Sequence, residues 1–175
     1  SDFNQDLSNW NVGNVTNMGN MFNGAISFNG DINGWDIAED AFNMFKGASS
    51  FNKPINDWDV SAVTNMYGMF EGASAFNQAI GTWDVSAVES MGSMFSEASS
   101  FNQEIGNWEV GAVKNMSTMF KSASSFNQDI SDWDVSSVTA MDRMFTYLDS
   151  YNPDLSTWDV SSVKTMEWMF TGASS

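Results

Sequence analysis

Apolar and polar residues alternate along this chain with a long period, and the period predicts most of its structure. Each period opens with Phe-Asn, places Ile four residues after the Phe and Trp seven residues after it, and closes on a Met-x-x-Met-Phe segment. Seven repeats of about 25 residues begin at positions 3, 28, 51, 76, 101, 126 and 151, and all 13 methionines fall in two columns of this register. A repeat of this length is typical of arrays in which each unit stacks on the next.

The second half of each repeat has the spacing of an amphipathic helix. In the third repeat Met66, Met69, Phe70 and Ala73 stand at positions i, i+3, i+4 and i+7, which places all four on one helical face. Serine precedes this segment where an N-cap would lie, and glycine follows where a helix would end. The serines are Ser61, Ser86, Ser136 and Ser161, and the glycines are Gly24, Gly47, Gly72 and Gly172.

The first half of each repeat is too short for a second helix, and we expect a short strand around its Asn-Gln-Asp-Ile segment. The sequence therefore predicts an α/β repeat solenoid of seven repeats, each with one short strand and one short helix, with a short parallel sheet. Residues 1–175 would form a single solenoid domain. Since an apolar solenoid end needs a polar cap, we expect the chain to be a segment of a longer array.

The repeat resembles the bacterial surface protein 26-residue repeat family, a leucine-rich-repeat-like group of BspA-like surface repeats. The resemblance covers all seven repeats and rests on segments such as "FNQDI", "WDVSSV" and "MDRMF". The second repeat lacks two residues after its Trp, and the seventh opens with Tyr151 in place of Phe. The resemblance implies a cell-surface or secreted protein of bacterial type, with no enzymatic activity and no defined ligand.

Composition excludes several classes of function. The chain has no histidine and no cysteine, so His-dependent catalysis, thiolate metal sites and disulfides are ruled out. Its net charge of −16 argues against nucleic acid, which requires clustered lysine and arginine. No apolar run approaches the length of a membrane span, so we expect no membrane insertion by this segment.

The asparagine column and the tryptophan column are candidate functional features. The asparagine after each Phe favours a structural hydrogen-bonded ladder over a row of ligand-binding amides. The tryptophan column favours core packing over a carbohydrate-stacking surface. The asparagines are Asn4, Asn29, Asn52, Asn77, Asn102, Asn127 and Asn152.

Two acidic columns suggest either turn capping or a calcium site. Carboxylates can accept hydrogen bonds from turn N–H groups, or they can bind calcium between neighbouring repeats. The first column, after six of the seven Trp residues, contains Asp36, Asp59, Asp84, Glu109, Asp134 and Asp159. The second, three residues after the Phe or Tyr, contains Asp6, Asp31, Glu104, Asp129 and Asp154, of which Asp31, Asp129 and Asp154 are the candidate calcium ligands. Neither column has the spacing of an EF-hand.

One variable column suggests a partner-binding patch. Phe42 and Tyr67 occupy equivalent positions in adjacent repeats on a mostly polar face, and Trp168 lies one position further on in the last repeat. Such aromatics can anchor a partner or simply cover the deletion in the second repeat.

The leading hypothesis is a non-catalytic cell-surface repeat module for adhesion, spacing or protein–protein interaction. The alternatives are a calcium-stabilised structural or adhesive array and a carbohydrate- or ice-binding surface. We also expect end-to-end self-association or contact with neighbouring repeats, and no cofactor other than calcium.

Overall fold

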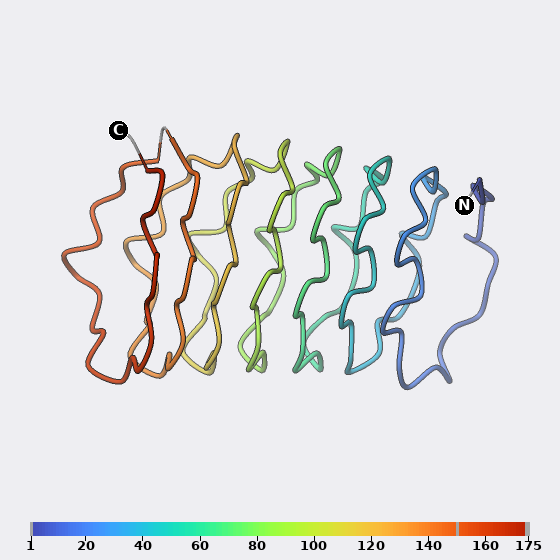
Figure 1. Ribbon diagram of the computed structural model, residues 1–175. Helices are drawn as coiled ribbons and strands as arrows, with labels where there is room; N and C mark the ends of the chain where they lie inside the picture. The colour runs from blue at the N-terminus through green and yellow to red at the C-terminus, as the bar shows by residue number, and fades with distance from the viewer. Residues whose placement is uncertain (1, 150, 174–175) are drawn as a thin grey trace.

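The chain winds into successive coils that lie side by side, with the two termini at opposite ends (Figure 1). The computed structural model describes residues 2–149 and 151–173. One repeat makes one coil, so equivalent residues of neighbouring repeats are in contact: Asn102 donates its N–H to the side chain of Asn77, 25 residues earlier. The 25-residue period is therefore the length of chain needed to go once around the coil.

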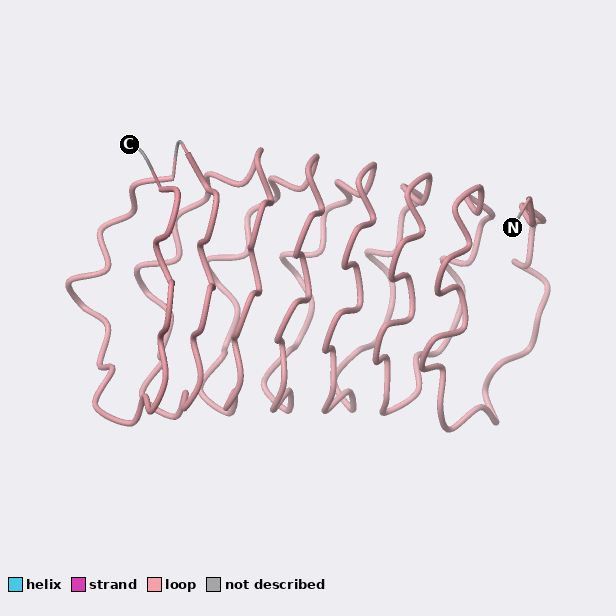
Figure 2. Cartoon of the chain, viewed as in Figure 1, coloured by secondary structure: helices cyan, strands magenta, loops and turns pink. Residues whose placement is uncertain are grey.

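Neither helices nor strands occur in the described part of the chain, which consists of loops and turns (Figure 2). Consequently, these residues contain no helix long and apolar enough to cross a membrane. The regular pairing consists of isolated parallel bridges that run from coil to coil. These bridges join Asp40 to Asn65, Asn65 to Ser90, Ser90 to Asn115, Asn115 to Ala140, and Ala140 to Thr165.

The predicted helix is wrong, and a chain of tight turns takes its place. In the third repeat, Met69 N–H donates to Met66 O and Ala73 N–H donates to Phe70 O, each across three residues. Between these bonds, Gly68 N–H donates to Gly92 O and Phe70 N–H to Met94 O, in the next coil. Backbone N–H groups thus divide between the local turn and the neighbouring coil, whereas a helix would direct them all to its own chain.

Residues in the left-handed backbone conformation, with positive φ, explain why the Met-x-x-Met-Phe segment cannot form a helix. Two residues in every repeat have positive φ, and an α-helix requires φ near −63° throughout. The first column comprises Asn20, Asn43, Gly68, Ser93, Thr118, Arg143 and Trp168, and the second comprises Gly24, Gly47, Gly72, Glu97, Ser122, Tyr147 and Gly172. A positive φ at the third residue of a turn is the mark of a type II turn, which explains the glycine and asparagine in these columns.

The predicted strand is also wrong. The Asn-Gln-Asp-Ile segments of neighbouring coils lie side by side, but the described residues form no backbone ladder there. The predicted N-cap serines have a different role as well: Ser61 donates its N–H and its hydroxyl to Asp59, which closes a turn. The α/β, leucine-rich-repeat-like solenoid predicted from the sequence is therefore replaced by a stack of turns.

The core runs along the whole stack as columns of equivalent side chains. Met66, Met69, Phe70 and Ala73 are all fully buried, so the predicted burial pattern is correct although the helix is not. Phe95 packs against Phe101 of the next repeat with ring centroids 3.9 Å apart. Each fully buried Phe or Met contributes roughly 1.5–3 kcal/mol.

Candidate binding groove

The first acidic column caps turns. The Oδ1 atom of Asp59 accepts the Ser61 N–H at 3.0 Å and the Ser61 hydroxyl at 2.7 Å. Asp84 makes the same two bonds with Ser86, and Asp134 accepts the Ser136 N–H at 3.1 Å. This geometry is the Asx-turn that aspartate favours.

These hydrogen bonds lower the pKa values of the carboxyl groups that accept them. The Ser61 hydroxyl, followed by the Ser61 N–H, lowers the pKa of Asp59 below its ordinary value. In the second column, the Ser131 N–H lowers the pKa of Asp129 in the same way. Hydrogen bonds to the ionised form favour it, so these groups stay charged to lower pH than free aspartate.

The second acidic column also caps turns, because its carboxylates accept backbone N–H groups two residues later in the chain. Asp31 accepts the Asn33 N–H at 3.1 Å, Asp129 the Ser131 N–H at 2.9 Å, and Asp154 the Ser156 N–H at 3.0 Å. Among the residues that the structure describes, no three acidic side chains converge to hold a metal ion. The calcium alternative stays a prediction, and the contacts on the carboxylates are those of turn capping.

The asparagine column forms a ladder that runs from Asn4 to Asn127. The side-chain oxygens of Asn4, Asn29, Asn52, Asn77 and Asn102 accept the backbone N–H of the next asparagine at 2.8–3.0 Å. These bonds replace the missing backbone ladder on this side of the coil, because each amide satisfies a donor of the following repeat.

From Trp35 to Trp158 the tryptophan column is buried, and its indole N–H groups are bonded inside the stack, whereas Trp10 is exposed. Trp83 Nε1 donates to Ile55 O at 3.2 Å, and Trp108 Nε1 donates to Ile80 O at 3.1 Å. Each indole thus ties its coil to the preceding one. A ring held in this way presents no face to a sugar, which disfavours the carbohydrate-stacking alternative.

The predicted aromatic patch is only partly assembled. Phe42 and Tyr67 stack with centroids 5.9 Å apart and are half-buried. Trp168 belongs to a different column, lies near the C-terminal end and has Arg143 over its ring at 4.0 Å. The structure therefore brings the first two together without the third, and their role in binding stays a prediction.

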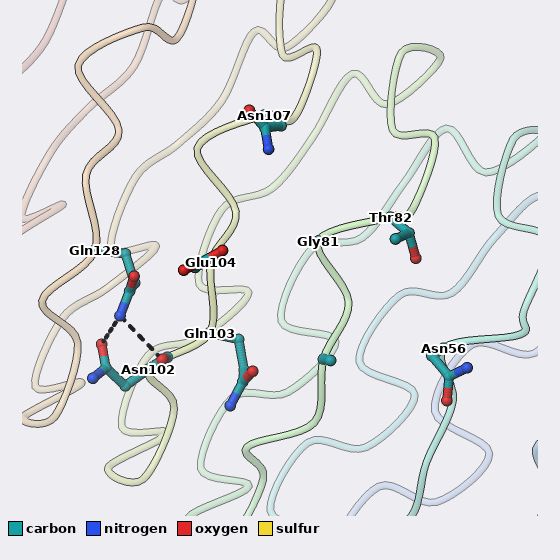
Figure 3. Close-up of a pocket in the computed structure, with 9 residues that line it drawn as sticks. Asn56, Gly81, Thr82, Asn102, Gln103, Glu104, Asn107 and Gln128 are labelled. Atoms are coloured by element: carbon teal, nitrogen blue, oxygen red, sulfur yellow. Dashed lines mark hydrogen bonds between the residues drawn. The ribbon is translucent and has the colours of Figure 1, made fainter.

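An open groove crosses four coils on the side of the asparagine ladder (Figure 3). Its volume is about 640 Å³. Amide, hydroxyl and carboxylate side chains line the groove. At its edge, Gln128 Nε2 donates to the side-chain oxygen and to the backbone carbonyl of Asn102. The lining residues are Asn56, Ala79, Gly81, Thr82, Asn102, Gln103, Glu104, Asn107 and Gln128.

Some main-chain groups of the groove are left unpaired. Among the described residues, the backbone N–H and C=O groups of Gln103 and the backbone N–H of Glu104 have no hydrogen-bond partner. The coils approach closely here, since a Cβ added at Gly81 would lie 2.3 Å from Glu104 O. The Glu104 carbonyl therefore faces the Cα of Gly81, and a side chain at position 81 would require the coils to shift.

Sequence reasoning did not single out this groove, although one signal pointed toward it. Thr82 and Asn107 belong to a column that varies between repeats: Asn9, Gly34, Asp57, Thr82, Asn107, Asp132 and Thr157. Columns whose residue type varies between repeats are not needed for stacking, so their side chains can take part in ligand binding.

The fold and the groove define a class of protein: a repeat protein of stacked turns with a polar lateral groove. The chain belongs to the family described as Mycoplasma protein of unknown function, DUF285, whose model matches residues 1–80, 37–127 and 76–175. Three overlapping matches along one chain are consistent with a repeat family. No curated protein and no solved structure matches the chain. The leucine-rich-repeat-like solenoid expected from the sequence is wrong, and these comparisons give no support to a cell-surface or adhesive role.

Proposed function

We propose that the protein is a non-catalytic interaction module whose lateral groove binds an extended, basic polypeptide segment. The observation that carries this proposal is the groove itself, in which unpaired main-chain N–H and C=O groups lie beside the amides of Gln103 and Gln128. An extended peptide carries the complementary donors and acceptors along its whole length, and peptide recognition often uses such main-chain bonds.

Charge favours a basic segment over an acidic one. The net charge of the chain is −16, and Glu104 lies within the groove. Complementary charge raises the association rate and disfavours the wrong partners. The proposed ligand therefore combines an extended backbone with lysine or arginine side chains.

The lowered pKa values of the carboxyl groups favour a binding role over catalysis. Catalytic acid–base pairs need one carboxyl group with a raised pKa, whereas Asp59, Asp84 and Asp134 have lowered pKa values because serine groups bond them. A location at the cell surface or outside the cell is a further proposal, and it rests on the resemblance to bacterial surface repeats alone.

A peptide-binding titration tests the proposal. The probes are a fluorescein-labelled peptide of alternating lysine and threonine and a matched peptide of alternating glutamate and threonine, followed by anisotropy at low and physiological salt. We expect the basic peptide to bind and the acidic one not to bind. Ala79→Arg, which fills the groove, should weaken binding by about tenfold, or ~1.4 kcal/mol.

Ala62→Arg is the matched control, because Ala62 is exposed and lies outside the groove. It adds the same charge to the molecule and should leave the affinity near that of the wild type. Equal weakening by both variants would show general charge attraction in place of groove binding and would contradict the proposal, as would the absence of binding at low salt.

A further inference from the structure

Three asparagines of the chain are followed directly by glycine, and such pairs can undergo a spontaneous backbone reaction. The glycine nitrogen attacks the side-chain amide carbon of the asparagine, because glycine has no Cβ to hinder the approach and its backbone is free to turn. The reaction needs a glycine N–H that is not engaged elsewhere and a backbone that can move. The three pairs are Asn23-Gly24, Asn29-Gly30 and Asn33-Gly34.

The first pair is held by hydrogen bonds on both of its residues. Gly24 N–H donates to Lys46 O in the next coil at 2.7 Å, and Asn23 Nδ2 donates to Asn20 Oδ1 at 2.8 Å. Attack by the Gly24 nitrogen would therefore break one of the bonds that join the first two coils.

The second pair is part of the asparagine ladder. Asn29 Oδ1 accepts the Asn52 N–H at 2.9 Å, and Asn29 N–H donates to Asn4 Oδ1 at 2.8 Å. Gly30 is buried, and a Cβ added to it would overlap the backbone oxygen of Gln5. The backbone at this pair is therefore fixed between its two neighbouring coils.

The third pair is free to react. Asn33 and Gly34 are the central residues of a turn that Trp35 N–H closes on Ile32 O at 3.2 Å. Gly34 is exposed, and its N–H has no hydrogen-bond partner among the described residues. Apart from its chain neighbours, no atom lies within 4 Å of a Cβ added there. The Asn33 side chain makes one hydrogen bond, from Nδ2 to Asp57 Oδ2 at 2.7 Å, whereas Oδ1 has no partner.

We propose that Asn33-Gly34 is a self-modification site, at which the folded protein deamidates through a succinimide. The Gly34 nitrogen gives up its proton and bonds to Asn33 Cγ, the Cγ–Nδ2 bond breaks, and Nδ2 leaves as ammonia with that proton. Water then adds to one of the two ring carbonyls and opens the ring to aspartate or isoaspartate. Water is the sole co-reactant, and the step is independent of peptide binding in the lateral groove.

The modification weakens the contact between the second and third coils. It replaces the Nδ2 donor with a carboxylate beside Asp57, so two negative charges lie where the hydrogen bond was, and like charges at this separation repel. Isoaspartate in addition lengthens the main chain within the turn. The modified protein should therefore have a lower melting temperature than the unmodified one.

Peptide mapping of the folded protein, aged in mildly alkaline buffer, tests the site. Mass spectrometry with electron-transfer fragmentation separates asparagine, aspartate and isoaspartate at each of the three positions. We expect Asn33 to convert about tenfold faster than Asn23 or Asn29, which corresponds to ~1.4 kcal/mol in the activation barrier. In protein unfolded by urea the three rates should become similar, because the restraints of the fold are gone. Fastest conversion at Asn23 or Asn29, or equal rates in the folded protein, would overturn the proposal.

Two substitutions test the chemistry of the step. Gly34→Ala hinders the attacking nitrogen and should slow conversion of Asn33 by about tenfold. Asp132→Ala is the matched control, because Asp132 is the exposed, equivalent turn residue of the sixth repeat; it should leave the rate at Asn33 unchanged. Conversion of Asn33 at the wild-type rate in Gly34→Ala would show that the Gly34 nitrogen is not the nucleophile.

The effect on the coils is measured on a variant that carries the aspartate product. Asn33→Asp should lower the melting temperature, and adding Asp57→Asn to it should recover most of the loss, because one of the two opposed charges is removed. An Asn33→Asp protein as stable as the wild type would contradict the proposed weakening of the contact.

Discussion

At the residue scale, aspartate side chains act as turn caps, and the pKa of Asp59 reports this role. Removal of the Ser61 hydroxyl in Ser61→Ala should raise the pKa of Asp59 toward its ordinary value of 3.8, because the strongest bond to the ionised form is lost. A carboxyl-carbon NMR titration measures the shift. Asp84, capped by Ser86 in the next repeat, should keep its lowered pKa and serves as an internal control.

The sign of the pH effect follows from the lowered pKa. The cap on Asp59 stabilises the fold at pH values above the ordinary pKa, and this contribution is lost as the pH falls through the lower, folded-state value. An unchanged Asp59 titration in Ser61→Ala would show that the hydroxyl bond has no effect on the carboxyl group, contrary to this account.

A second residue-scale prediction concerns the left-handed positions. Ser122 has a φ of 57° where four of the seven repeats have glycine. A side chain in this region costs about 1–2 kcal/mol, part of which is offset by the greater freedom of glycine in the unfolded chain. Ser122→Gly should therefore stabilise the protein by about 0.5–1 kcal/mol in urea unfolding.

Ser125→Gly is the control for this substitution. Ser125 is an exposed serine three residues later and is not among the residues with positive φ. Here glycine only adds freedom to the unfolded chain, so the variant should be destabilised by up to about 1 kcal/mol. Equal effects of the two substitutions would contradict the assignment of strain to position 122.

At the scale of the single coil, burial could be predicted from the sequence but backbone conformation could not. The spacing of Met66, Met69, Phe70 and Ala73 correctly indicated one buried face. The same spacing also fits consecutive turns that are closed across three residues, because both structures bring side chains about three positions apart to the same side of the backbone. The distinguishing signal was glycine or asparagine at positions such as Asn20, Asn43 and Gly68, which favours positive φ inside the supposed helix.

The asparagine ladder is the coil-scale feature most open to a direct test. The Oδ1 atom of Asn77 accepts the Asn102 N–H at 3.0 Å and the Gln103 Nε2 at 2.9 Å. Asn77→Ala leaves both donors without this partner and should cost about 1 kcal/mol of unfolding free energy. Urea denaturation followed by tryptophan fluorescence measures the change.

Asn127→Ala is the matched control for the ladder. Asn127 donates its backbone N–H to Asn102, but its side chain makes no hydrogen bond with any other described residue. The substitution preserves that backbone bond, so the stability should change by only a few tenths of a kcal/mol. If both variants lost the same stability, side-chain acceptance would not be what joins the coils.

At the scale of the whole molecule, the groove could not have been predicted from the repeat alone. Its shape depends on how closely successive coils approach, as at Gly81 and Glu104, and on the absence of a backbone ladder on that side. The spacing of residues in the sequence predicted stacking but not this asymmetry between the two sides of the coil. The variable column that contains Thr82 and Asn107 marked the position without indicating its shape.

The core of this molecule is a stack of ring and aliphatic columns, so the cost of a cavity should depend on position along the stack. Phe95 is fully buried and packs against Phe70, Phe101, Trp108 and Phe120. Phe95→Ala should cost about 3–5 kcal/mol, because it leaves a void between coils on both sides. Phe170→Ala is the control: this ring is 54% exposed and its removal should cost less than half as much. Urea unfolding compares the two variants, and equal losses would contradict the expectation that the cost of a cavity follows the burial of the ring.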